Sequence, residues 1–538
     1  MRSKTSYTSF PLIFLLCIVL FVVIVRIRLL NVPLERDEGE YAYIGQLILD
    51  GIPPYQEAYN MKFPGMYFLY AGILWIFGET HTAIHTALLI ANIFTLVLLF
   101  ILARSAYDDW VAVSAAGAFA LLSLSYHVQG FWANAEHFIL PFVIGAYLLL
   151  FVWQKKKSRP FLLMSGIFLG CAALIKQHGA FFSLVGFLIL FQIVWQQRKI
   201  ENRIRWNALG TLMAGFMIPL LLCGMYLAFH GVLQQFFRWT FLYAKAYSSI
   251  VSLNQVKENF LSSFLPLWQH SILLWILACV GALSLYTSHS YRQSRLFLTA
   301  WIFSSTIALS IGFYYRPHYF ILILPVAALL FGLGIRSIVQ TFSGASTPLL
   351  KYLPPVIILG FSLISTLVAH WDVLIQFSPA EVTRTTYLQN PFLYSERIAE
   401  LIEERSTSQD RIAIIGNEPQ ILFYAHRRSA TPYIYTYSLM EDQPLARQFR
   451  SEMIKQIESS TPKLLIFTQL QPEWYQQPLG EQQLHAWFFR YAESLYKPSV
   501  RFEYTPGSND TLLITEPHDL MNRSKHHYWI TIYERRTL

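Results

Sequence analysis

The chain has 538 residues, of which 54% are hydrophobic and 16% aromatic, and its mean hydropathy is +0.39. This composition excludes an ordinary soluble multidomain protein and predicts a polytopic membrane protein. The formal net charge of +9 would suit a nucleic-acid partner only if the basic residues formed one surface. They lie instead in short clusters between apolar segments, which is typical of membrane topology and predicts no nucleic-acid partner.

The apolar segments predict about eleven transmembrane helices. The first of these, an N-terminal run of about twenty apolar residues, is too long for a signal peptide and is expected to remain in the protein. The expected spans cover approximately residues 10–30, 82–103, 110–125, 138–153, 161–175, 179–195, 207–229, 268–287, 296–313, 318–336 and 353–370.

One further apolar segment, residues 63–78, is short and is interrupted by a Pro-Gly pair. The basic clusters of the later loops fall on the same side as Arg2 and Lys4 only if this segment does not span. The positive-inside rule therefore predicts that residues 63–78 form a re-entrant or juxtamembrane helix. The later basic clusters are residues 155–159, 198–205 and 292–295.

With this topology the candidate functional clusters share the extracytoplasmic side. Arg26, Arg28 and Arg36 at the outer end of the first helix run against the rule, and we attribute them to snorkelling side chains and neighbouring acids. The segments expected outside are the loops 31–81, 126–137, 230–266 and 314–318, together with the C-terminal tail.

The composition changes at about residue 371, and strand patterns then alternate with helical patterns. We therefore predict a transmembrane domain over 1–371, a linker over 372–390 and a soluble α/β domain over 391–538. The expected strands are 411–416, 463–467 and 511–514, and the expected helices are 394–405 and 481–495.

The first external loop carries a group of acids around Asp37. One interpretation is structural: Asp37 is an N-cap and Glu40 its capping-box partner, so that a helix runs from Glu38 to Leu49. The other is functional, because ionised groups at a membrane boundary commonly mark a site. In that case Asp37, or its neighbour Glu38, serves as a general base on a hydroxyl.

Later in the same loop, Lys62 reaches the interface just before the short apolar segment. This lysine either snorkels to lipid headgroups or contacts a leaving phosphate. Three further clusters bring an acid, cations and histidines to the same side, and each also has a bland interpretation as a solvated helix start or an interfacial histidine. They are Asn134-Ala135-Glu136-His137, Lys176-Gln177-His178-Gly179 and Arg316-Pro317-His318-Tyr319.

Together these motifs resemble the GT-C superfamily of membrane glycosyltransferases, specifically the bacterial relatives of dolichyl-phosphate-mannose protein mannosyltransferases and of the lipid A aminoarabinose transferase. The resemblance covers about residues 10–370. Arg36-Asp37-Glu38 is similar to the acidic motif of the first loop, Lys62-Phe63-Pro64 to a Lys-Pro-Pro element, Glu136 to a second acidic site, and Pro317-His318-Tyr319 to a late His-Tyr element. Phe63 departs from the proline of the family, and Glu136 from an aspartate.

The resemblance implies an inverting transfer of a sugar from a polyprenyl-phosphate donor to a lipid, glycan or protein acceptor, at the outer side of the bacterial inner membrane. Asp37 would take the acceptor proton. Lys62 would meet the charge on the phosphate, with Lys176, Arg316 or His318 as weaker candidates. Glu136 would orient the acceptor or position one of these cations. The further substrate contacts would come from Arg36, His137, Lys176, His178, Arg316, His318 and Tyr319.

Two alternative functions and one question about a metal stay open at this stage. A lipid or solute transporter would place charges in the middle of its helices, and a scaffold whose tail binds partners would need no acidic cluster. A divalent metal is a third open point, because Asp37, Glu38 and Glu136 carry hard oxygen ligands.

Overall fold

The computed structural model describes residues 10–196, 202–388, 390–469, 478–504, 513–515 and 528–536. The chain divides into two compact units. The helical unit comprises Met1–Asn31, His85–Cys223 and Val251–Ser378, and the mixed unit comprises Val32–Ile84, Gly224–Ile250 and Pro379–Leu538. The expected boundaries at 371 and 390 stay a prediction. The N-terminal basic residues and the pair 198–199 that entered the topology argument lie outside the described residues.

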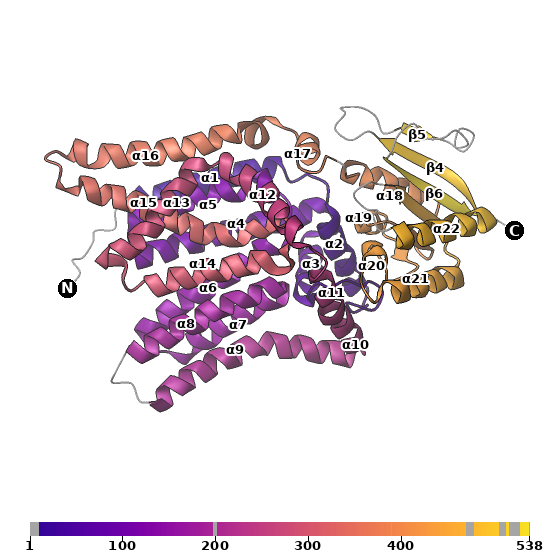
Figure 1. Ribbon diagram of the computed structural model, residues 1–538, viewed down its shortest axis with the longest axis horizontal. Coiled ribbons are helices and arrows are strands. Elements are labelled where there is room, and N and C mark those ends of the chain that lie inside the picture. Colours follow the sequence, from indigo (N-terminus) through magenta and orange to yellow (C-terminus); the bar gives the residue numbers. More distant parts are fainter. Residues whose placement is uncertain are drawn as a thin grey trace. The chain divides into compact units, whose positions relative to one another are not determined.

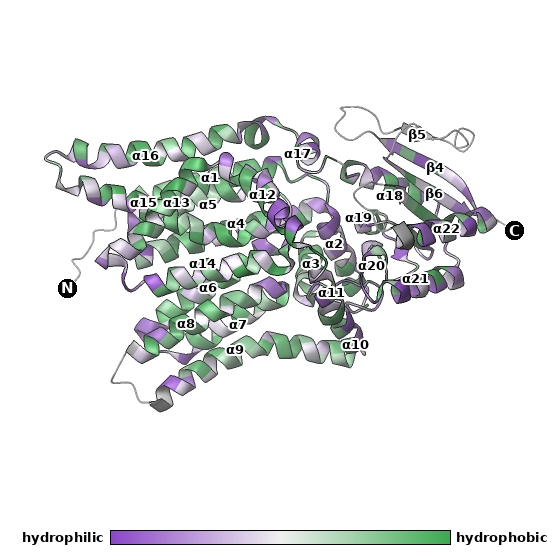
Figure 2. Cartoon of the chain, in the orientation of Figure 1, coloured by the Kyte–Doolittle hydropathy of each residue, from purple (hydrophilic) through white to green (hydrophobic). Residues whose placement is uncertain are grey.

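Each of the expected spans is a helix, and these helices are predominantly hydrophobic (Figure 2). Short 3-10 turns interrupt the sequence at η1 (Tyr126–Val128), η2 (Gln177–Gly179) and η6 (Pro317–Ile323). The long helices are α1 (Phe10–Arg28), α4 (His81–Ala106), α5 (Asp109–Ser123), α6 (Ala135–Lys156), α7 (Arg159–Ile175), α8 (Ala180–Gln196), α9 (Asn202–Phe229), α12 (Leu253–Gln269), α13 (Ile272–Thr287), α14 (Arg295–Ser310), α15 (Leu324–Thr341) and α16 (Pro348–Ala369).

Within the described residues, eight helices are long and apolar enough to cross a membrane. A ninth span results if α12 and α13, which meet at a bend of 99°, are taken as one. The expected count of about eleven is higher because α5 and α7 are apolar but only 15 and 17 residues long. Most of α5 is buried inside the helical unit, so its apolar surface contacts other helices.

Two helices of this unit, α13 and α15, approach each other closely at glycines. A methyl group on Gly281 would lie 1.8 Å from the carbonyl oxygen of Leu330, and one on Gly334 would lie 2.1 Å from that of Leu277. Small residues at such positions let helix backbones pack directly in an apolar bundle, where van der Waals contact is the main attraction between helices.

The mixed unit contains a six-stranded sheet in the order β2-β1-β3-β6-β4-β5. Strands β4, β5 and β6 of this sheet are labelled in Figure 1. The pairs β1–β2 and β1–β3 are parallel and the others are antiparallel. Its strands are β1 (Arg411–Ile415), β2 (Arg428–Ser429), β3 (Leu464–Gln469), β4 (Tyr496–Tyr504), β5 (Leu513–Thr515) and β6 (Tyr528–Arg535). Its helical segments are α2 (Arg36–Leu49), α3 (Pro64–Phe77), α10 (Leu233–Phe237), η3 (Arg238–Tyr243), α11 (Ala244–Ser248), α17 (Pro379–Thr386), α18 (Ser395–Glu404), α19 (Pro419–Tyr424), α20 (Tyr437–Met440), α21 (Ala446–Ser460) and α22 (Pro478–Leu495).

The expected fold class, a polytopic helical protein with a C-terminal α/β region, is confirmed. The expected strands correspond to β1, β3 and β5, and the expected helices to α18 and α22. The segment 63–78 forms α3, a helix of only 14 residues that falls short of a span.

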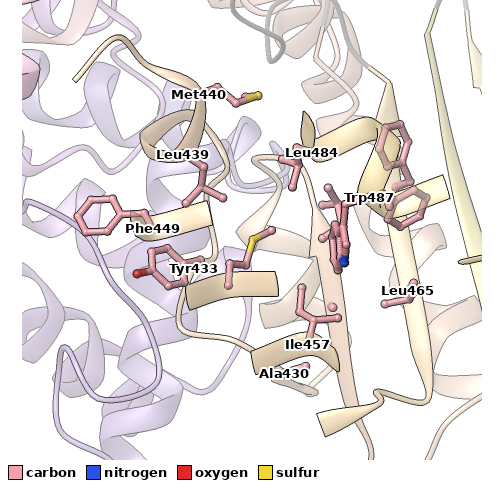
Figure 3. Close-up of a cluster of buried hydrophobic side chains, with 14 of the residues drawn as sticks. Ala430, Tyr433, Leu439, Met440, Phe449, Ile457, Leu465, Leu484 and Trp487 are labelled. Atoms are coloured by element: carbon pink, nitrogen blue, oxygen red, sulfur yellow. The ribbon is translucent and has the colours of Figure 1, made fainter. Parts of the chain in front are cut away.

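The core of the mixed unit joins segments that are far apart in sequence (Figure 3). Trp239 of η3 stacks on Phe449 of α21 with ring centres 4.7 Å apart, and Tyr59 of the first loop stacks on Trp239 at 5.2 Å. Leu465 of β3 and Trp487 of α22 belong to the same buried cluster. The residues around Asp37 therefore share one packed unit with the sheet.

Candidate active site

Helix α2 begins with a capping box, but its residues differ from those expected. The N-cap is Glu35, whose Oε1 accepts from the backbone N–H of Glu38 at 3.1 Å, while Oε2 of Glu38 accepts from the N–H of Glu35 at 3.1 Å. The interpretation of Asp37 as N-cap with Glu40 as partner is therefore wrong, since the box lies two residues earlier. Asp37 is in the first turn of the helix, and its side chain contacts Lys62.

Asp37 and Glu40 share one cation. The Nζ of Lys62 lies 2.8 Å from Oδ1 of Asp37 and 2.8 Å from Oε2 of Glu40. The two carboxylates differ in exposure, because the Glu40 side chain is 0% exposed and that of Asp37 is 28% exposed. Asp37 is thus the carboxylate of the pair that a substrate can reach.

Glu40 is held by further donors in addition to Lys62. Asn60 donates its Nδ2 to Oε2 at 2.6 Å, and the Tyr67 hydroxyl donates to Oε1 at 2.7 Å. Burial raises the pKa of Glu40, an effect that the charge of Lys62 opposes. Burial would lower the pKa of Lys62, but the adjacent carboxylates of Asp37 and Glu40 raise it above its usual range, so the lysine is charged.

Arg36, expected to bind substrate, is engaged by the C-terminal part of the mixed unit. Its Nε donates to the carbonyl of Asn417 at 2.5 Å, and its Nη2 lies 2.6 Å from Oε1 of the fully buried Glu418 and 3.1 Å from Oδ1 of Asn390. The Tyr435 hydroxyl donates to the carbonyl oxygen of Arg36 at 3.0 Å. These contacts fix the start of α2, and with it Asp37, on the turn that follows β1.

A second cluster lies in the helical unit, around the ion pair of Glu136 and Lys176. The Nζ of Lys176 is 2.5 Å from Oε1 of Glu136, and it also lies 4.4 Å from the ring centre of Tyr319. The His178 ring is 5.1 Å from the same tyrosine ring. The ends of α6 and α7 and the turn η6 therefore bring these expected residues together.

The other expected residues of this unit are placed differently. His318 is buried, and its Nδ1 lies 2.7 Å from Oε1 of Gln129. His137 is buried at the start of α6, whereas Arg316 is exposed and lies over the ring of Tyr314. Arg26, attributed above to snorkelling, is buried and donates to the carbonyls of Gly130 and Ser123 at 3.0 and 3.3 Å.

Several residues of the Asp37 cluster were not singled out from the sequence. Asn60 and Tyr67 complete the environment of Glu40, and Asn417 with Glu418 anchors Arg36. A signal for the last pair existed, because polar residues that directly follow a buried parallel strand gather at one edge of a sheet. No sequence pattern connected that edge to Arg36.

Two of the three carboxylates considered as metal ligands have ammonium partners, and the third, Glu38, belongs to the capping box. Asp37 pairs with Lys62 and Glu136 with Lys176. Among the described residues, no group of three or more His, Cys, Asp or Glu side chains is arranged to hold a metal ion.

Comparison with known proteins identifies relatives at two levels. Residues 61–223, which include Lys62, Glu136 and Lys176, match the family described as dolichyl-phosphate-mannose-protein mannosyltransferase. No curated protein is significantly similar to the chain in sequence. Solved structures, in contrast, match along nearly the whole chain.

A crystal structure of ArnT from Cupriavidus metallidurans bound to undecaprenyl phosphate superposes with a TM-score of 0.61 at 13% identity, covering 98% of each chain. The archaeal oligosaccharyltransferase AglB from Archaeoglobus fulgidus, in complex with an inhibitory peptide and a dolichol-phosphate, gives a TM-score of 0.55 at 14% identity over 96% of this chain and 75% of that one. The fold is thus shared with these proteins, and the resemblance to GT-C membrane glycosyltransferases that the motifs indicated is confirmed.

Proposed function

We propose that this protein is an inverting membrane glycosyltransferase that moves a sugar from a polyprenyl-phosphate donor to a hydroxyl or phosphate of a lipid, glycan or protein acceptor. The family match over residues 61–223 and the shared fold with ArnT bound to undecaprenyl phosphate and AglB bound to dolichol-phosphate support a lipid-phosphate substrate. The site faces the extracytoplasmic side of a bacterial inner membrane, as the charge bias of the loops predicts.

The observation that carries this proposal is the unequal pair of carboxylates on Lys62. Glu40 is fully buried and accepts from Lys62, Asn60 and Tyr67, so it serves as a fixed counter-charge. Asp37 shares the same ammonium but keeps 28% of its side chain exposed. A partly exposed carboxylate beside a cation is the arrangement that a base and a leaving phosphate require.

In the proposed step, Asp37 accepts the proton of the acceptor hydroxyl while the hydroxyl oxygen attacks the anomeric carbon of the donor. The bond from that carbon to the phosphate oxygen breaks on the opposite face, so the configuration inverts. The phosphate diester leaves as a monoester and gains negative charge, which a cation stabilises more effectively than a proton donor does.

Lys62 is suited to this role because it has two carboxylate partners. If its ammonium turns from Asp37 to the leaving phosphate, it keeps the contact of 2.8 Å with Glu40. Glu40 in turn keeps the bonds from Asn60 and Tyr67. The exchange therefore leaves no buried charge without a partner.

The second candidate acid, Glu136, belongs to the helical unit. Glu136 is fully buried and bound to Lys176, so in this proposal it positions Lys176 and the substrate near it and does not act as the base. Arg36 acts by holding the start of α2 through Glu418, and His318 contributes through its contact with Gln129.

The test is sugar transfer by Asp37→Asn, with Asp50→Asn as the matched control. Asp50 is the C-cap of the same helix and forms an exposed pair with Arg428, so its replacement alters the helix charge equally at a distance from the site. Purified protein in nanodiscs is given polyprenyl-phosphate-linked sugars, and release of polyprenyl phosphate is measured. We expect Asp37→Asn to lose at least about 100-fold in rate, the usual contribution of a general base.

A third variant, Glu38→Gln, separates the two candidate bases. Glutamine also completes a capping box, so α2 should keep its N-terminus. A normal rate in Asp37→Asn would exclude Asp37 as the base, and a loss confined to Glu38→Gln would transfer the role to Glu38. To find the acceptor, glycolipids and glycoproteins of cells carrying wild type or Asp37→Asn would be compared by mass spectrometry.

A further inference from the structure

Around the Glu136–Lys176 ion pair, the helical unit contains several buried polar atoms that have no hydrogen-bond partner in the described part of the chain. Among the residues that the structure describes, no group forms a hydrogen bond with Oδ1 or Nδ2 of Asn134, with Oε2 of Glu136, or with either ring nitrogen of His178. Asn134 is 1% exposed, Glu136 0% and His178 6%. Burying polar groups without hydrogen bonds costs free energy, and hydrogen bonds to a bound ligand would offset this cost.

Contacts link Glu136 and His178 through Lys176 and Tyr319, and Asn134 lies two residues before Glu136 in the chain. Asn134 and Glu136 are the N-cap and the second residue of α6, Glu136 binds Lys176, and both Lys176 and His178 contact the ring of Tyr319. The imidazole of His137, on the next residue of α6, likewise has no partner within the described part of the chain. The cluster therefore spans two helix ends and one aromatic ring.

Asn134 shows that the local fold does not use these groups. An asparagine at an N-cap normally accepts a bond from one of the first helical N–H groups. In the described structure, the Asn134 side chain forms no such bond. Its amide is thus committed neither to the helix nor to another side chain there.

The atoms without hydrogen-bond partners among the described residues include both donors and acceptors. This mixture restricts the chemical class of ligand that can bind them. Oε2 of Glu136 and Oδ1 of Asn134 only accept, Nδ2 of Asn134 only donates, and a neutral imidazole offers one of each. A phosphate ester ionised at neutral pH offers acceptors alone and would leave the acceptors unsatisfied. The charge of Lys176 is moreover already balanced by Glu136 at 2.5 Å. Hydroxyl groups, which both donate and accept, satisfy the whole set.

We propose that Asn134, Glu136 and His178 form a recognition site for the hydroxyl groups of a glycosyl substrate, and that this site does not bind the lipid phosphate. The proposal rests on the proposed function and identifies the part of the substrate that this cluster contacts. Tyr319 provides an aromatic wall next to it. The phosphate is left to the separate Lys62 cluster of the mixed unit.

The proposal makes an unusual prediction about stability, which a structural role would not share. Asn134→Leu removes a buried amide without partners and keeps its shape, so the unfolding temperature should stay the same or rise. Affinity for the sugar should fall by about 3- to 10-fold, which corresponds to the loss of one neutral hydrogen bond. His178→Leu should behave similarly. Ser114→Ala is the matched control, because Ser114 is a buried hydroxyl of α5 that also lacks a partner among the described residues.

The experiment measures binding to the full chain in nanodiscs of two probes, a polyprenyl phosphate and the same lipid carrying a hexose, together with KM for a glycan acceptor. Weaker binding of the hexose-bearing lipid alone supports the proposal and assigns the site to the donor sugar. A rise confined to the acceptor KM supports it and assigns the site to the acceptor sugar. Equal loss for both lipids, no change at all, or a lowered unfolding temperature in Asn134→Leu overturns it.

Binding of the two lipids is measured without turnover, so this part of the experiment is separate from the fate of the proposed function. Suppose that Asn134→Leu binds the hexose-bearing lipid no more tightly than the bare polyprenyl phosphate, while Asp37→Asn transfers sugar at the wild-type rate. The sugar-recognition site would then be supported, and Asp37 would be excluded as the base. The opposite pair of results would keep the base and reject the sugar site.

Discussion

Replacement of Lys62 by methionine tests the arrangement on which the proposed chemistry depends. Methionine is an unbranched side chain one atom shorter than lysine, and it carries no charge. The variant leaves the fully buried Glu40 with Asn60 and Tyr67 as donors but without a counter-charge. It also removes the partner of Asp37, which matters less because a carboxylate that is 28% exposed is partly hydrated.

The magnitude follows from burial. Removing one partner of a buried ion pair typically costs about 3–5 kcal/mol, and the two remaining donors on Glu40 favour the lower end. We therefore expect Lys62→Met to lose about 3 kcal/mol in the free energy of unfolding near pH 8. The double variant Lys62→Met/Glu40→Gln should recover most of this loss, because it also removes the buried carboxylate that Lys62→Met leaves without a counter-charge. Comparison with both single variants in a double-mutant cycle isolates the interaction free energy of the two side chains.

The loss should depend on pH with a definite sign. Burial, together with the charge of Asp37, raises the pKa of Glu40, and removal of Lys62 takes away the charge that opposes this rise. A carboxyl group with a raised pKa in the folded state contributes stability below its unfolded pKa of about 4.3, and this stability is lost as the pH rises through the folded value. Lys62→Met should thus be nearly as stable as wild type at about pH 5 and progressively less stable toward pH 8.

Thermal unfolding of the purified protein at several pH values measures both effects. Lys245→Met, which replaces an exposed lysine of α11 in the same unit, is the control for loss of one positive charge. The reasoning is refuted if Lys62→Met unfolds at the same temperature as Lys245→Met, or if its destabilisation does not change between acid and alkaline pH.

Two further predictions concern the packing and titration of the mixed unit. Gly39→Ala should lower the free energy of unfolding by about 1–3 kcal/mol, because the new methyl group would lie 2.4–2.5 Å from Cβ, Cα and N of Gln420. Gly72→Ala, at a helical position with no atom within 4 Å of the added group, should instead stabilise by about 0.5–1 kcal/mol, and denaturant titration of both variants decides. Burial raises the pKa of Glu441 to about 8, against the effect of the bond donated by Tyr243, so the wild type loses stability as the pH rises from about 4.3 through this value. Glu441→Gln should remove that loss and unfold at a higher temperature than wild type at pH 9, and equal unfolding temperatures at pH 6 and pH 9 in the wild type would contradict this.

The positions of the apolar helices and of β1 and β3 followed from the sequence because apolar periodicity determines both directly. The number of transmembrane spans was predicted less accurately than their positions. The 15 residues of α5 and the 17 of α7 are as apolar as true spans, and only the structure shows that α5 is almost entirely surrounded by protein.

The start of α2 shows why the local register at the candidate site could not be predicted. Glu35 with Glu38 and Asp37 with Glu40 are both acids three residues apart, so both pairs fit a capping box. The capping box is formed by the earlier pair, Glu35 and Glu38, because Asp37 and Glu40 bind Lys62. Lys62 is 22 residues or more away in sequence. A pattern of local spacing carries no information about such a partner.

The distribution of charge also changes how phosphate binding must be understood. Sequence reasoning treated Lys62, Lys176 and Arg36 as cations open to a phosphate, but each contacts a carboxylate of its own unit, and those of Glu40, Glu136 and Glu418 are fully buried. A phosphate that binds any of these three cations therefore weakens the charge compensation of a carboxylate. For Lys176 and Arg36 that carboxylate is fully buried. Lys62 alone of the three can exchange an exposed partner, Asp37, and keep a buried one, which is why we expect the lipid phosphate to be bound there.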